Sequence, residues 1–256
     1  MPTALITGGT VGIGHAFAKA LAARGYDLVL ASRDADGLAR VAQEFEATYS
    51  ISVEVIPTDL ARREDTLALA RRIEDPERPI DLLVNNAGFA VHDSLLVTDL
   101  SIHDRAMDVM CKAVLILSGA AARAMKARGQ GAILNVTSSS SAITTGNYSA
   151  IKAWASVYTE ALSNELRGTG VRVMALLPGW VKTEFHSRGG VTAHNLPGFV
   201  WIDADVLVKQ ALKHLEAGKV LSVPTGRWAF AVWVGHMIPR RTTRWLSRAL
   251  TKSREP

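Results

Sequence analysis

Residues 3–14 read Thr-Ala-Leu-Ile-Thr-Gly-Gly-Thr-Val-Gly-Ile-Gly, a short aliphatic strand that runs into a glycine-rich turn and then into a helix-period segment. Glycines permit a tight turn and let backbone N–H groups approach a pyrophosphate, which the N-terminus of the following helix attracts. A glycine-rich string alone is a weak signal, because glycines often only make turns. Here it follows a strand and opens a strand–helix–strand unit, which is the context that supports the functional interpretation. The sequence therefore predicts a dinucleotide-binding turn.

The rest of the chain repeats this alternation of apolar strands and helix-period segments. We expect strands at residues 3–7, 27–31, 53–57, 82–85, 132–137, 171–177 and 220–223. We expect helices at residues 12–24, 35–49, 62–74, 101–128, 147–167 and 203–217, with Ser101 and Asp104 forming a capping box. Most strands are almost continuously apolar, as expected when both faces of a sheet are covered. The pattern predicts a doubly wound α/β fold of the Rossmann type, with seven mostly parallel strands in a single domain, residues 1–256.

The composition limits the class of protein. Of the 256 residues, 48% are hydrophobic and 21% are charged, which excludes a disordered or fibrous chain. The single cysteine, Cys111, excludes an intrachain disulfide and a cysteine-based zinc cluster. No apolar run is long enough for a membrane span, and the N-terminus lacks the features of a secretory signal. We therefore expect a cytoplasmic globular protein.

The surplus of positive charge is concentrated near the C-terminus. The chain has 29 lysines and arginines against 24 aspartates and glutamates, and the whole surplus lies in residues 237–256. Residues 1–236 are formally neutral, so we expect no nucleic-acid partner. After Pro239, helical spacing predicts a basic arc and an apolar arc. The basic arc consists of Arg241, Arg244, Arg248 and Lys252, and the apolar arc consists of Trp245, Leu246, Ala249 and Leu250.

Two interpretations of this apolar and basic tail, residues 227–256, stay open. The pattern is typical of an interfacial helix that makes peripheral contact with an anionic membrane. It is equally compatible with a C-terminal helix that docks against its own domain or a second subunit, leaving its arginines in solvent.

The glycine-rich turn is the first of five motifs that follow one another along the chain. TGGTVGIG at residues 7–14 has the form TGxxxGxG, and Asp59 follows the third strand. Residues 85–88 read NNAG, residues 148–152 read YSAIK, and residues 178–183 read PGWVKT. In this order the motifs resemble those of the short-chain dehydrogenase/reductase family, and the resemblance covers residues 3–185. It implies an NAD(P)-dependent oxidoreductase that interconverts alcohols and carbonyls.

The resemblance, together with the end of the second strand, predicts the residues that hold the cofactor. They are Gly8, Thr10, Gly12, Ile13, Gly14, Ser32, Arg33, Asp59, Asn86, Ala87, Gly88, Tyr148, Lys152, Pro178, Gly179, Val181 and Thr183.

Ser32 and Arg33 decide the expected type of cofactor. An acidic residue at the end of this strand accepts hydrogen bonds from a ribose 2′-hydroxyl, whereas a basic residue pairs with a 2′-phosphate. The chain offers the Arg33 guanidinium and the Ser32 hydroxyl, so NADP(H) is the preferred cofactor and NAD(H) remains possible. Asp34 would weaken this preference if it paired with Arg33. The alternative interpretation of Arg33 is an ordinary solvated arginine.

Tyr148 and Lys152 are four residues apart on a predicted helix, so both side chains lie on one face. A free tyrosine ionises near about pH 10, and an adjacent ammonium is expected to lower that pKa. In the family, the tyrosine is the acid and base, the lysine tunes it and holds the nicotinamide ribose, and a serine positions the substrate oxygen. Ser138 matches that serine, although the loop before Tyr148 is shorter than in the family. The serines at 139–141 are the alternatives.

One position departs from the family pattern. The fourth helix of the family usually carries an asparagine that helps to hold a water linking the lysine to solvent, and Met110 occupies that position here. A thioether cannot donate a hydrogen bond and accepts one only weakly. The proton relay must then use other groups, run more slowly or be absent. Cys111 and Lys112 are expected to point in other directions, with Cys111 a packing residue and not a nucleophile.

Residues 184–202 are predicted to form an irregular insertion that covers the substrate. The apolar and aromatic residues of this region favour an apolar substrate. They are Phe185, His186, His194, Leu196, Phe199, Val200 and Trp201, and Phe89, Ala90 and Val91 are expected to line the floor of the same cavity. Two histidines without nearby carboxylates do not predict a metal site.

These observations favour one function and leave an alternative. The favoured function is an NADP(H)-dependent oxidoreductase that interconverts a carbonyl and an alcohol on an apolar small molecule. The alternative is a non-catalytic cofactor-binding redox sensor or scaffold, which Met110 favours and the serine, tyrosine and lysine set opposes. The resemblance also implies a homodimer or homotetramer formed through the helices at 101–128 and 147–167.

Overall fold

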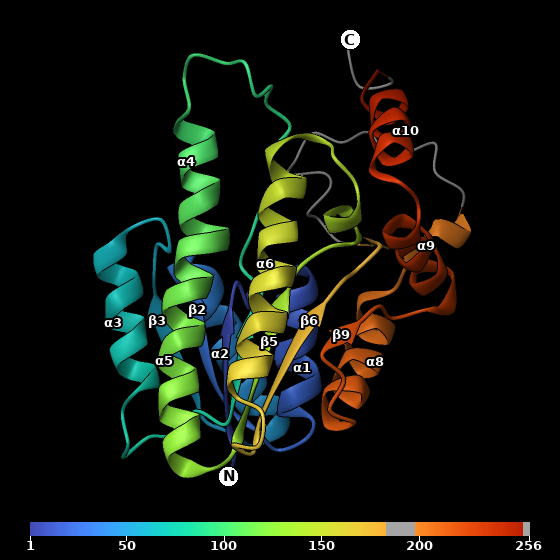
Figure 1. Cartoon of the computed structure of the whole chain (residues 1–256). Coiled ribbons are helices and arrows are strands. Elements are labelled where there is room, and N and C mark those ends of the chain that lie inside the picture. The colour runs from blue at the N-terminus through green and yellow to red at the C-terminus, as the bar shows by residue number, and fades with distance from the viewer. Residues whose placement is uncertain (183–197, 253–256) are drawn as a thin grey trace.

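The computed structural model describes residues 1–182 and 198–252, and its central feature is one sheet of seven parallel strands (Figure 1). The strands are β1 (Thr3–Thr7), β2 (Asp27–Ser32), β3 (Val53–Pro57), β4 (Leu82–Asn85), β5 (Gly131–Val136), β6 (Val171–Leu176) and β9 (Leu221–Ser222). They lie in the order β3-β2-β1-β4-β5-β6-β9, and every neighbouring pair is parallel. The predicted seven-stranded Rossmann fold is confirmed.

Helices cover both faces of this sheet (Figure 1). On one face, the core contains residues of α1 (Gly12–Ala22), α2 (Ala35–Tyr49) and α8 (Ala204–Glu216). On the other face, it contains residues of α3 (Arg63–Ile73), α5 (Ala113–Arg128) and α6 (Gly146–Glu165). Within the part of the chain that the structure describes, no helix is long and apolar enough to cross a membrane.

The apolar strands contribute side chains to both cores. Along β1, Leu5 belongs to one core while Ala4 and Ile6 belong to the other, and all three side chains are fully buried. Successive residues of a strand point to opposite faces. Because both faces are covered, every position must be apolar, which explains the continuous apolar runs in the sequence.

The order of the strands positions a ligand crevice. From β1 the chain moves to β2 and β3 on one side of the sheet, and then returns to β4 on the other side. The crossover helices therefore diverge beside β1, and in doubly wound folds ligands bind at the carboxyl ends of the strands where this reversal occurs. The glycine-rich turn follows β1, and the NNAG motif begins at the end of β4. Ser138 follows β5, so the predicted site residues meet at one edge.

Several local expectations are corrected. The helix expected at 101–128 is α4 (Ser101–Met107), a π-helical segment η1 (Asp108–Lys112) and α5. The capping box is wrong, because Leu100 holds the N-cap position and the Asp99 carboxylate accepts from the Ser101 N–H at 2.9 Å. Elements that the sequence did not predict are a small two-stranded sheet, β7 (Trp180–Val181) with β8 (Trp201–Ile202), and the short helix η3 (Gly198–Val200).

The tail forms two helices, α9 (Gly226–Met237) and α10 (Arg240–Lys252), of which only the second was expected. The apolar run in α9 is too short for a membrane span, and no helix was predicted for it. A helix that packs one side on its own domain needs much less length. Most of the expected substrate-covering insertion lies outside the described residues.

Candidate active site

The turn after β1 is fastened to the NNAG motif. The side-chain amide of Asn86 donates to the carbonyl oxygens of Thr7 and Gly8 at 3.0 and 3.1 Å, and Thr7 Oγ1 accepts from the backbone N–H of Asn86 at 3.0 Å. Gly8 has a φ of +69°, and a Cβ on Gly14 would lie 2.1 Å from the Gly8 oxygen and 2.4 Å from Asn86 Nδ2. Only glycine fits such a close approach.

The N-terminus of α1 completes a cradle for a pyrophosphate. Gly12 is the first residue of α1, and Thr10 and Ile13 flank it in the same turn. Among the described residues, no side chain caps the first turn after Val11, so its backbone N–H groups are left for a ligand. An uncapped helix end behind a glycine turn suits an anion. The residues present therefore fit the phosphates of a dinucleotide.

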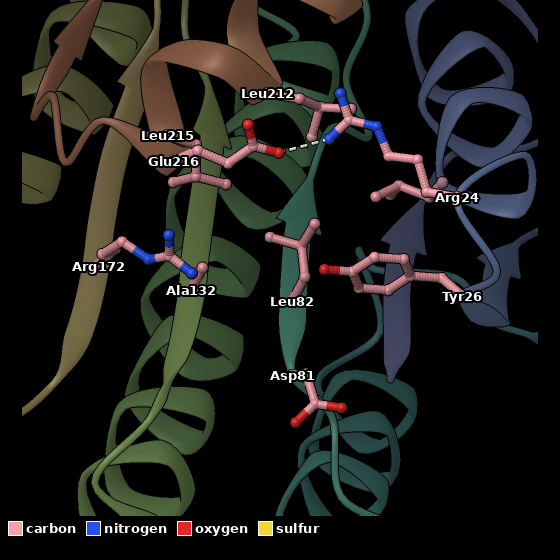
Figure 2. A pocket seen from close by; sticks show the side chains of 10 residues that line it. Arg24, Tyr26, Asp81, Leu82, Ala132, Arg172, Leu212, Leu215 and Glu216 are labelled. Atoms are coloured by element: carbon pink, nitrogen blue, oxygen red, sulfur yellow. Dashed lines mark hydrogen bonds and ion pairs between the residues drawn. The ribbon is translucent and has the colours of Figure 1, made fainter. Parts of the chain in front are cut away.

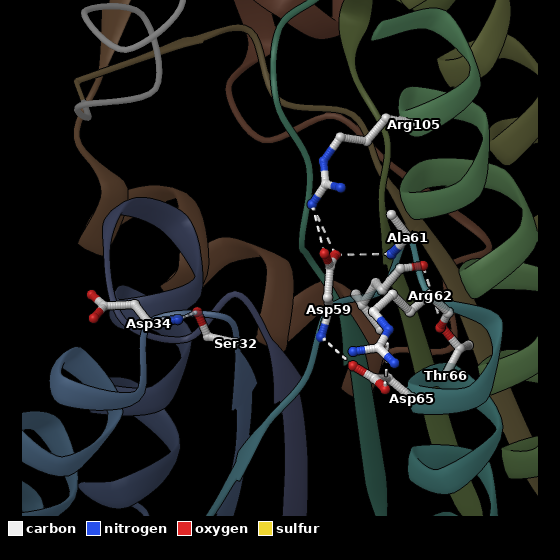
Figure 3. Close-up of polar contacts among 9 residues, drawn as sticks. Ser32, Asp34, Asp59, Ala61, Arg62, Asp65, Thr66 and Arg105 are labelled. Atoms are coloured by element: carbon white, nitrogen blue, oxygen red, sulfur yellow. Dashed lines mark hydrogen bonds and ion pairs between the residues drawn. The ribbon is translucent and has the colours of Figure 1, made fainter. Parts of the chain in front are cut away.

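Ser32 ends β2 beside this turn, and Arg33 follows it. Asp34 caps α2, because its carboxylate accepts from the backbone N–H of Gly37 at 2.9 Å. The Asp34 N–H faces Ser32 Oγ at 3.4 Å (Figure 3). Within the described residues, the exposed Arg33 guanidinium forms no ion pair with Asp34. The pairing that would weaken a preference for NADP(H) is therefore not observed.

Asp59 lies across from Ser32, and Arg105 from α4 holds it (Figure 3). Arg105 Nη2 is 2.8 Å from Asp59 Oδ1 and 3.0 Å from Oδ2, and the Ala61 N–H donates to Oδ1 at 3.1 Å. Burial opposes ionisation of this carboxyl, but these hydrogen bonds and the charges of Arg105 and Arg33 lower its pKa below the ordinary value. The sequence analysis missed Arg105, which lies 46 residues from Asp59.

A network of buried polar side chains holds the end of β4 in place. Asn85 Nδ2 donates to Ser118 Oγ at 3.0 Å and to Asn135 Oδ1 at 2.9 Å, and Asn135 Nδ2 donates to Thr159 Oγ1 at 2.9 Å. All four residues are 4% exposed or less. The network joins β4 and β5 to α5 and α6, and it fixes the strand ends that carry the NNAG motif and Ser138. Nothing in the sequence pattern marked these residues as partners.

The structure brings Ser138, Tyr148 and Lys152 together. Ser138 caps the short helix η2 (Ser139–Ala142), where its Oγ accepts from the Ser140 N–H at 3.1 Å. Tyr148 lies in the first turns of α6 and shares a hydrogen bond with Ser138. Lys152 is 5% exposed, and its Nζ lies 5.6 Å from the centre of the Tyr148 ring. The partner of the Tyr148 hydroxyl is therefore Ser138, which favours this serine over its neighbours.

Burial sets the ionisation of both groups. It raises the pKa of Tyr148 to about 12, and the hydrogen bond to Ser138 only partly offsets this rise. It also lowers the pKa of Lys152 to about 8, against a small opposing contribution from Cys111. Lys152 Nζ donates to the Val136 carbonyl oxygen at 2.9 Å. The expectation that the lysine lowers the tyrosine pKa is wrong for the protein without cofactor. Burial of the phenol dominates and raises this pKa, although Lys152 lies only four residues away.

The buried ammonium of Lys152 gives a testable effect on stability. Its pKa is 10.5 ordinarily and about 8 in the fold, so between these values the unfolded chain binds more protons and stability rises with pH. The cost of burying the charge is therefore present at neutral pH and disappears at high pH. Lys152→Met should raise the free energy of unfolding by about 2 kcal/mol near neutrality. This gain should shrink toward about pH 10.

Urea denaturation at the two pH values measures this effect. Lys126→Met, at an exposed position of α5, is the matched control and should change stability little at either pH. A variant at 152 that is less stable than the parent at neutral pH would contradict the prediction.

Met110 and Lys152 both lie next to Gly88. Met110 is 2% exposed within η1, and a Cβ on Gly88 would be 3.0 Å from Met110 Sδ and 3.7 Å from Lys152 Nζ. The neighbouring Cys111 is buried, which raises its pKa to about 11, and its Sγ contacts Met107 Sδ at 3.9 Å. Such a thiol is not a nucleophile at neutral pH.

Residues 178–182 of the PGWVKT motif lie next to the serine segment that follows β5. The Pro178 carbonyl oxygen accepts from the Ser139 N–H at 2.9 Å, which ties this motif to the serine segment. A Cβ on Gly179 would lie 2.2 Å from the Trp228 ring, so α9 packs directly on the motif. Val181 is 3% exposed in β7. The Ala87 N–H, on the opposite side, donates to Thr7 Oγ1 at 3.0 Å.

Part of the predicted substrate region is described. Trp180 and Trp201 contact each other edge to face at 5.7 Å, and Trp228 Nε1 donates to the Val200 carbonyl oxygen at 3.2 Å. Val91 is buried and Phe89 is half-buried. The other predicted residues lie outside the described residues or side chains: Thr183, Phe185, His186, His194, Leu196 and the side chain of Phe199.

A hollow at the opposite edge of the sheet is separate from this crevice (Figure 2). It lies where the strands begin, and the ion pair between Arg24 and Glu216 at 2.6 Å closes one side. Its lining residues are Leu21, Arg24, Tyr26, Asp81, Leu82, Ala132, Arg172, Leu212, Leu215 and Glu216. Across the described residues there is no cluster of three or more side chains that suits a metal ion.

Comparisons with known proteins agree with this geometry. A family model described as short chain dehydrogenase matches residues 2–190. A galactitol 2-dehydrogenase (L-tagatose-forming) from Cereibacter sphaeroides is 38% identical over 187 residues, which covers 71% of this chain and 72% of that protein. An uncharacterized oxidoreductase from Staphylococcus saprophyticus is 33% identical over 183 residues, covering 70% and 78% of the two chains.

Solved structures extend the similarity to almost the whole chain. A short-chain dehydrogenase from Sphingobium yanoikuyae in complex with NADPH has a TM-score of 0.84 and 30% identity, covering 94% of this chain and 97% of that one. A bulky-bulky ketone specific alcohol dehydrogenase from Comamonas testosteroni has a TM-score of 0.80 and 26% identity, covering 94% and 96%.

Proposed function

Because this chain belongs to the short-chain dehydrogenase/reductase family of NAD(P)-dependent oxidoreductases, we propose that it reduces an apolar ketone or aldehyde, or oxidises the matching alcohol, with NADP(H). The observation that carries the proposal is the close approach of Ser138, Tyr148 and the buried Lys152 at the carboxyl edge of the sheet. Tyr148 is hydrogen-bonded to Ser138, and Lys152 Nζ lies 5.6 Å from the tyrosine ring.

In this proposal Tyr148 moves the proton. The pKa of its phenol is about 12, so at neutral pH the hydroxyl is protonated and donates to the carbonyl oxygen of the substrate. Ser138 Oγ is oriented by the Ser140 N–H and donates a second hydrogen bond to the same oxygen. The nicotinamide of the bound cofactor supplies the hydride in reduction and accepts it in oxidation. In oxidation, Tyr148 takes the proton back.

Lys152 and the loops around it position the cofactor in this proposal. The ammonium is fixed by the Val136 carbonyl oxygen, and two of its hydrogens remain to hold the nicotinamide ribose. Below its pKa of about 8 the ammonium is charged, which strengthens its hydrogen bonds to the ribose hydroxyls. The glycine turn and the N-terminal end of α1 would hold the pyrophosphate, and Asp59 would contact the adenine. Pro178, Gly179 and Val181 would face the nicotinamide, and Thr183 lies outside the described residues.

The preference for NADP(H) rests on Arg33. Its guanidinium is exposed at the end of β2, free of Asp34, next to the Ser32 hydroxyl. The NADPH complex of a similar chain supports this choice. Arg33→Asp should lower kcat/KM for NADPH by about 10–100-fold, because a charge-assisted hydrogen bond to the phosphate becomes a repulsion. The value for NADH should stay within about threefold, since NADH lacks this phosphate.

Steady-state kinetics with both cofactors tests this prediction. Arg40→Asp makes the same change of charge at an exposed position farther along α2 and should leave the cofactor ratio unchanged. If Arg33→Asp lowers kcat/KM for NADPH and for NADH by the same factor, Arg33 does not recognise the 2′-phosphate.

The substrate class is proposed from the aromatic residues around β7 and β8. Trp180, Trp201 and Trp228 supply apolar contact area next to the PGWVKT motif. The solved alcohol dehydrogenase that accepts bulky-bulky ketones supports an apolar substrate, whereas the galactitol dehydrogenase points to a polyol. A panel of bulky ketones, small aldehydes and sugar alcohols with NADP(H) distinguishes them. Turnover confined to sugar alcohols would overturn the apolar class.

Met110 favours a second candidate, a cofactor-binding redox sensor or scaffold without turnover. The thioether lies beside Lys152, where it offers no donor to a proton relay. Tight binding of NADPH together with no oxidation over the whole panel would select this candidate. Measurable turnover excludes it.

Assembly into a homodimer or homotetramer is part of the proposal. Leu115 on α5 and Val157 on α6 are 50% and 66% exposed, and Trp154 stacks on Tyr158 at 5.0 Å beside them. Exposed apolar residues on two adjacent helices are typical of a subunit interface.

A further inference from the structure

Helix α9 presents an aromatic stripe to solvent. Phe230, Trp233 and Met237 are 65%, 58% and 67% exposed, and their spacing of three and four residues puts them on one face of the helix. The rings of Phe230 and Trp233 contact each other at 6.0 Å. Large side chains this exposed in a contiguous row indicate a contact surface.

Helix α10 continues this surface with positive charge. Arg241, Arg244 and Arg248 are exposed, and within the described residues none of them forms an ion pair. Trp245 is 68% exposed and lies four residues after Arg241 and three before Arg248, so it shares their face. The sequence analysis placed Trp245 on the arc opposite the arginines, and that placement is wrong.

The opposite side of α10 is anchored to the domain. Thr243 and Ser247 are 2% exposed, and Ser247 Oγ accepts from the Thr144 N–H at 3.0 Å. Because this side docks on the segment between η2 and α6, the arginines and Trp245 must face outward. Helix α10 therefore docks on its own domain with one side and exposes a basic face with the other.

Helix α9 packs on η2 and on the PGWVKT motif, next to the proposed catalytic residues. Val232 is 7% exposed, and a Cβ on Gly235 would lie 3.1 Å from Ala142 in η2. Trp228 packs on Gly179 of the PGWVKT motif. Figure 1 shows both helices at one edge of the molecule, next to the end of α6 that carries Tyr148. We call the outward side of the two helices the α9–α10 face.

We infer that the α9–α10 face binds the surface of an anionic lipid bilayer. Residues 226–252 contain six lysines and arginines and no aspartate or glutamate. Exposed tryptophans next to arginines match the boundary between headgroups and acyl chains, where the rings insert and the cations meet anionic lipids. A second copy of this chain fits less well, since a two-fold interface would set the arginines of one face against those of the other.

Sedimentation with vesicles tests the inference. The full chain is mixed at low salt with vesicles of phosphatidylcholine alone or of phosphatidylcholine with phosphatidylglycerol. We expect binding only to the anionic vesicles, and release at high salt, because salt screens the arginines. The triple variant Arg241→Gln, Arg244→Gln, Arg248→Gln should bind about a hundredfold more weakly, from a loss of about fivefold for each cation. Trp233→Ser with Trp245→Ser should also weaken binding, without a change in its salt dependence.

A charge-matched control separates this face from net charge. The variant Arg71→Gln, Lys126→Gln, Arg167→Gln removes three exposed cations elsewhere and should bind vesicles as the parent does. Equal loss in both triple variants, or equal binding to neutral vesicles, would overturn the inference. The inference would also be overturned if the triple variant at Arg241, Arg244 and Arg248 kept the parent's vesicle affinity but changed its oligomeric state in size-exclusion chromatography. Vesicle binding needs no turnover, so its outcome is independent of the proposed reaction.

Discussion

Replacement of Tyr148 by phenylalanine should reduce kcat by about a thousandfold while NADPH binding changes little. The phenol is the group that donates the proton to the substrate oxygen in the proposed reaction, and such a proton transfer contributes about 10²–10⁴-fold to a rate. Phenylalanine keeps the ring that packs near Lys152 and Ser138 but removes the hydroxyl. NADPH oxidation measures kcat, and quenching of protein fluorescence measures cofactor affinity.

Helix α6 supplies the control for this variant. Tyr158 lies ten residues after Tyr148, and its hydroxyl donates to the Leu115 carbonyl oxygen at 3.4 Å and shares a hydrogen bond with Ser118, away from Ser138 and Lys152. Tyr158→Phe is the same chemical change on the same helix, and its kcat should stay within about twofold of the parent. A Tyr148→Phe enzyme that keeps a tenth of the parent rate would show that another group moves the proton.

The second large effect is expected at Gly14. The Cβ of Gly14→Ala would lie 2.1 Å from the Gly8 oxygen and 2.4 Å from Asn86 Nδ2, and both atoms belong to the fastened turn. The turn must open to admit a methyl group, which pulls the backbone N–H groups away from the pyrophosphate. We expect NADPH affinity to fall by about a hundredfold, because the charge-assisted hydrogen bonds from these N–H groups to the pyrophosphate are lost. Fluorescence titration with NADPH measures the affinity.

Gly119→Ala is the matched control. Its Cβ would meet only the end of the flexible Arg123 side chain, at 3.4 Å in the middle of α5. Alanine in a helix interior should raise stability slightly, by about 0.5–1 kcal/mol, and leave NADPH affinity unchanged. Circular dichroism of both variants checks the fold. If Gly14→Ala binds NADPH normally, the turn is not the pyrophosphate site.

The fold was predictable because its signals are local. Seven apolar runs, each bounded by a turn or a helix-period segment, were sufficient for the sheet and the two helical layers. The glycines of the first turn and the four-residue spacing of Tyr148 and Lys152 are also local features. The structure places these residues at one edge because parallel strands all end there.

The parts that could not be predicted depend on contacts between distant segments. The clamp from Arg105 to Asp59 spans 46 residues, and the pair Asn85 and Asn135 spans 50. No periodicity reports which polar side chains face each other across a core. The Tyr148 pKa was missed for a related reason, since spacing reveals the neighbour but not the depth of burial that dominates the pKa.

The π-helical segment η1 accommodates one extra residue between α4 and α5, because its turn is wider than an α-helical turn. Val109, Met110 and Cys111 are consecutive and all buried, which a wider turn accommodates. If the same residues formed a regular α-helix instead, the downstream helix would be rotated by about 100° relative to α4. The faces of α4 and α5 that now pack on the same core would then diverge. The wide turn therefore absorbs one extra residue, so that α4 and α5 pack on the same core while Met110 stays in the wall near Lys152.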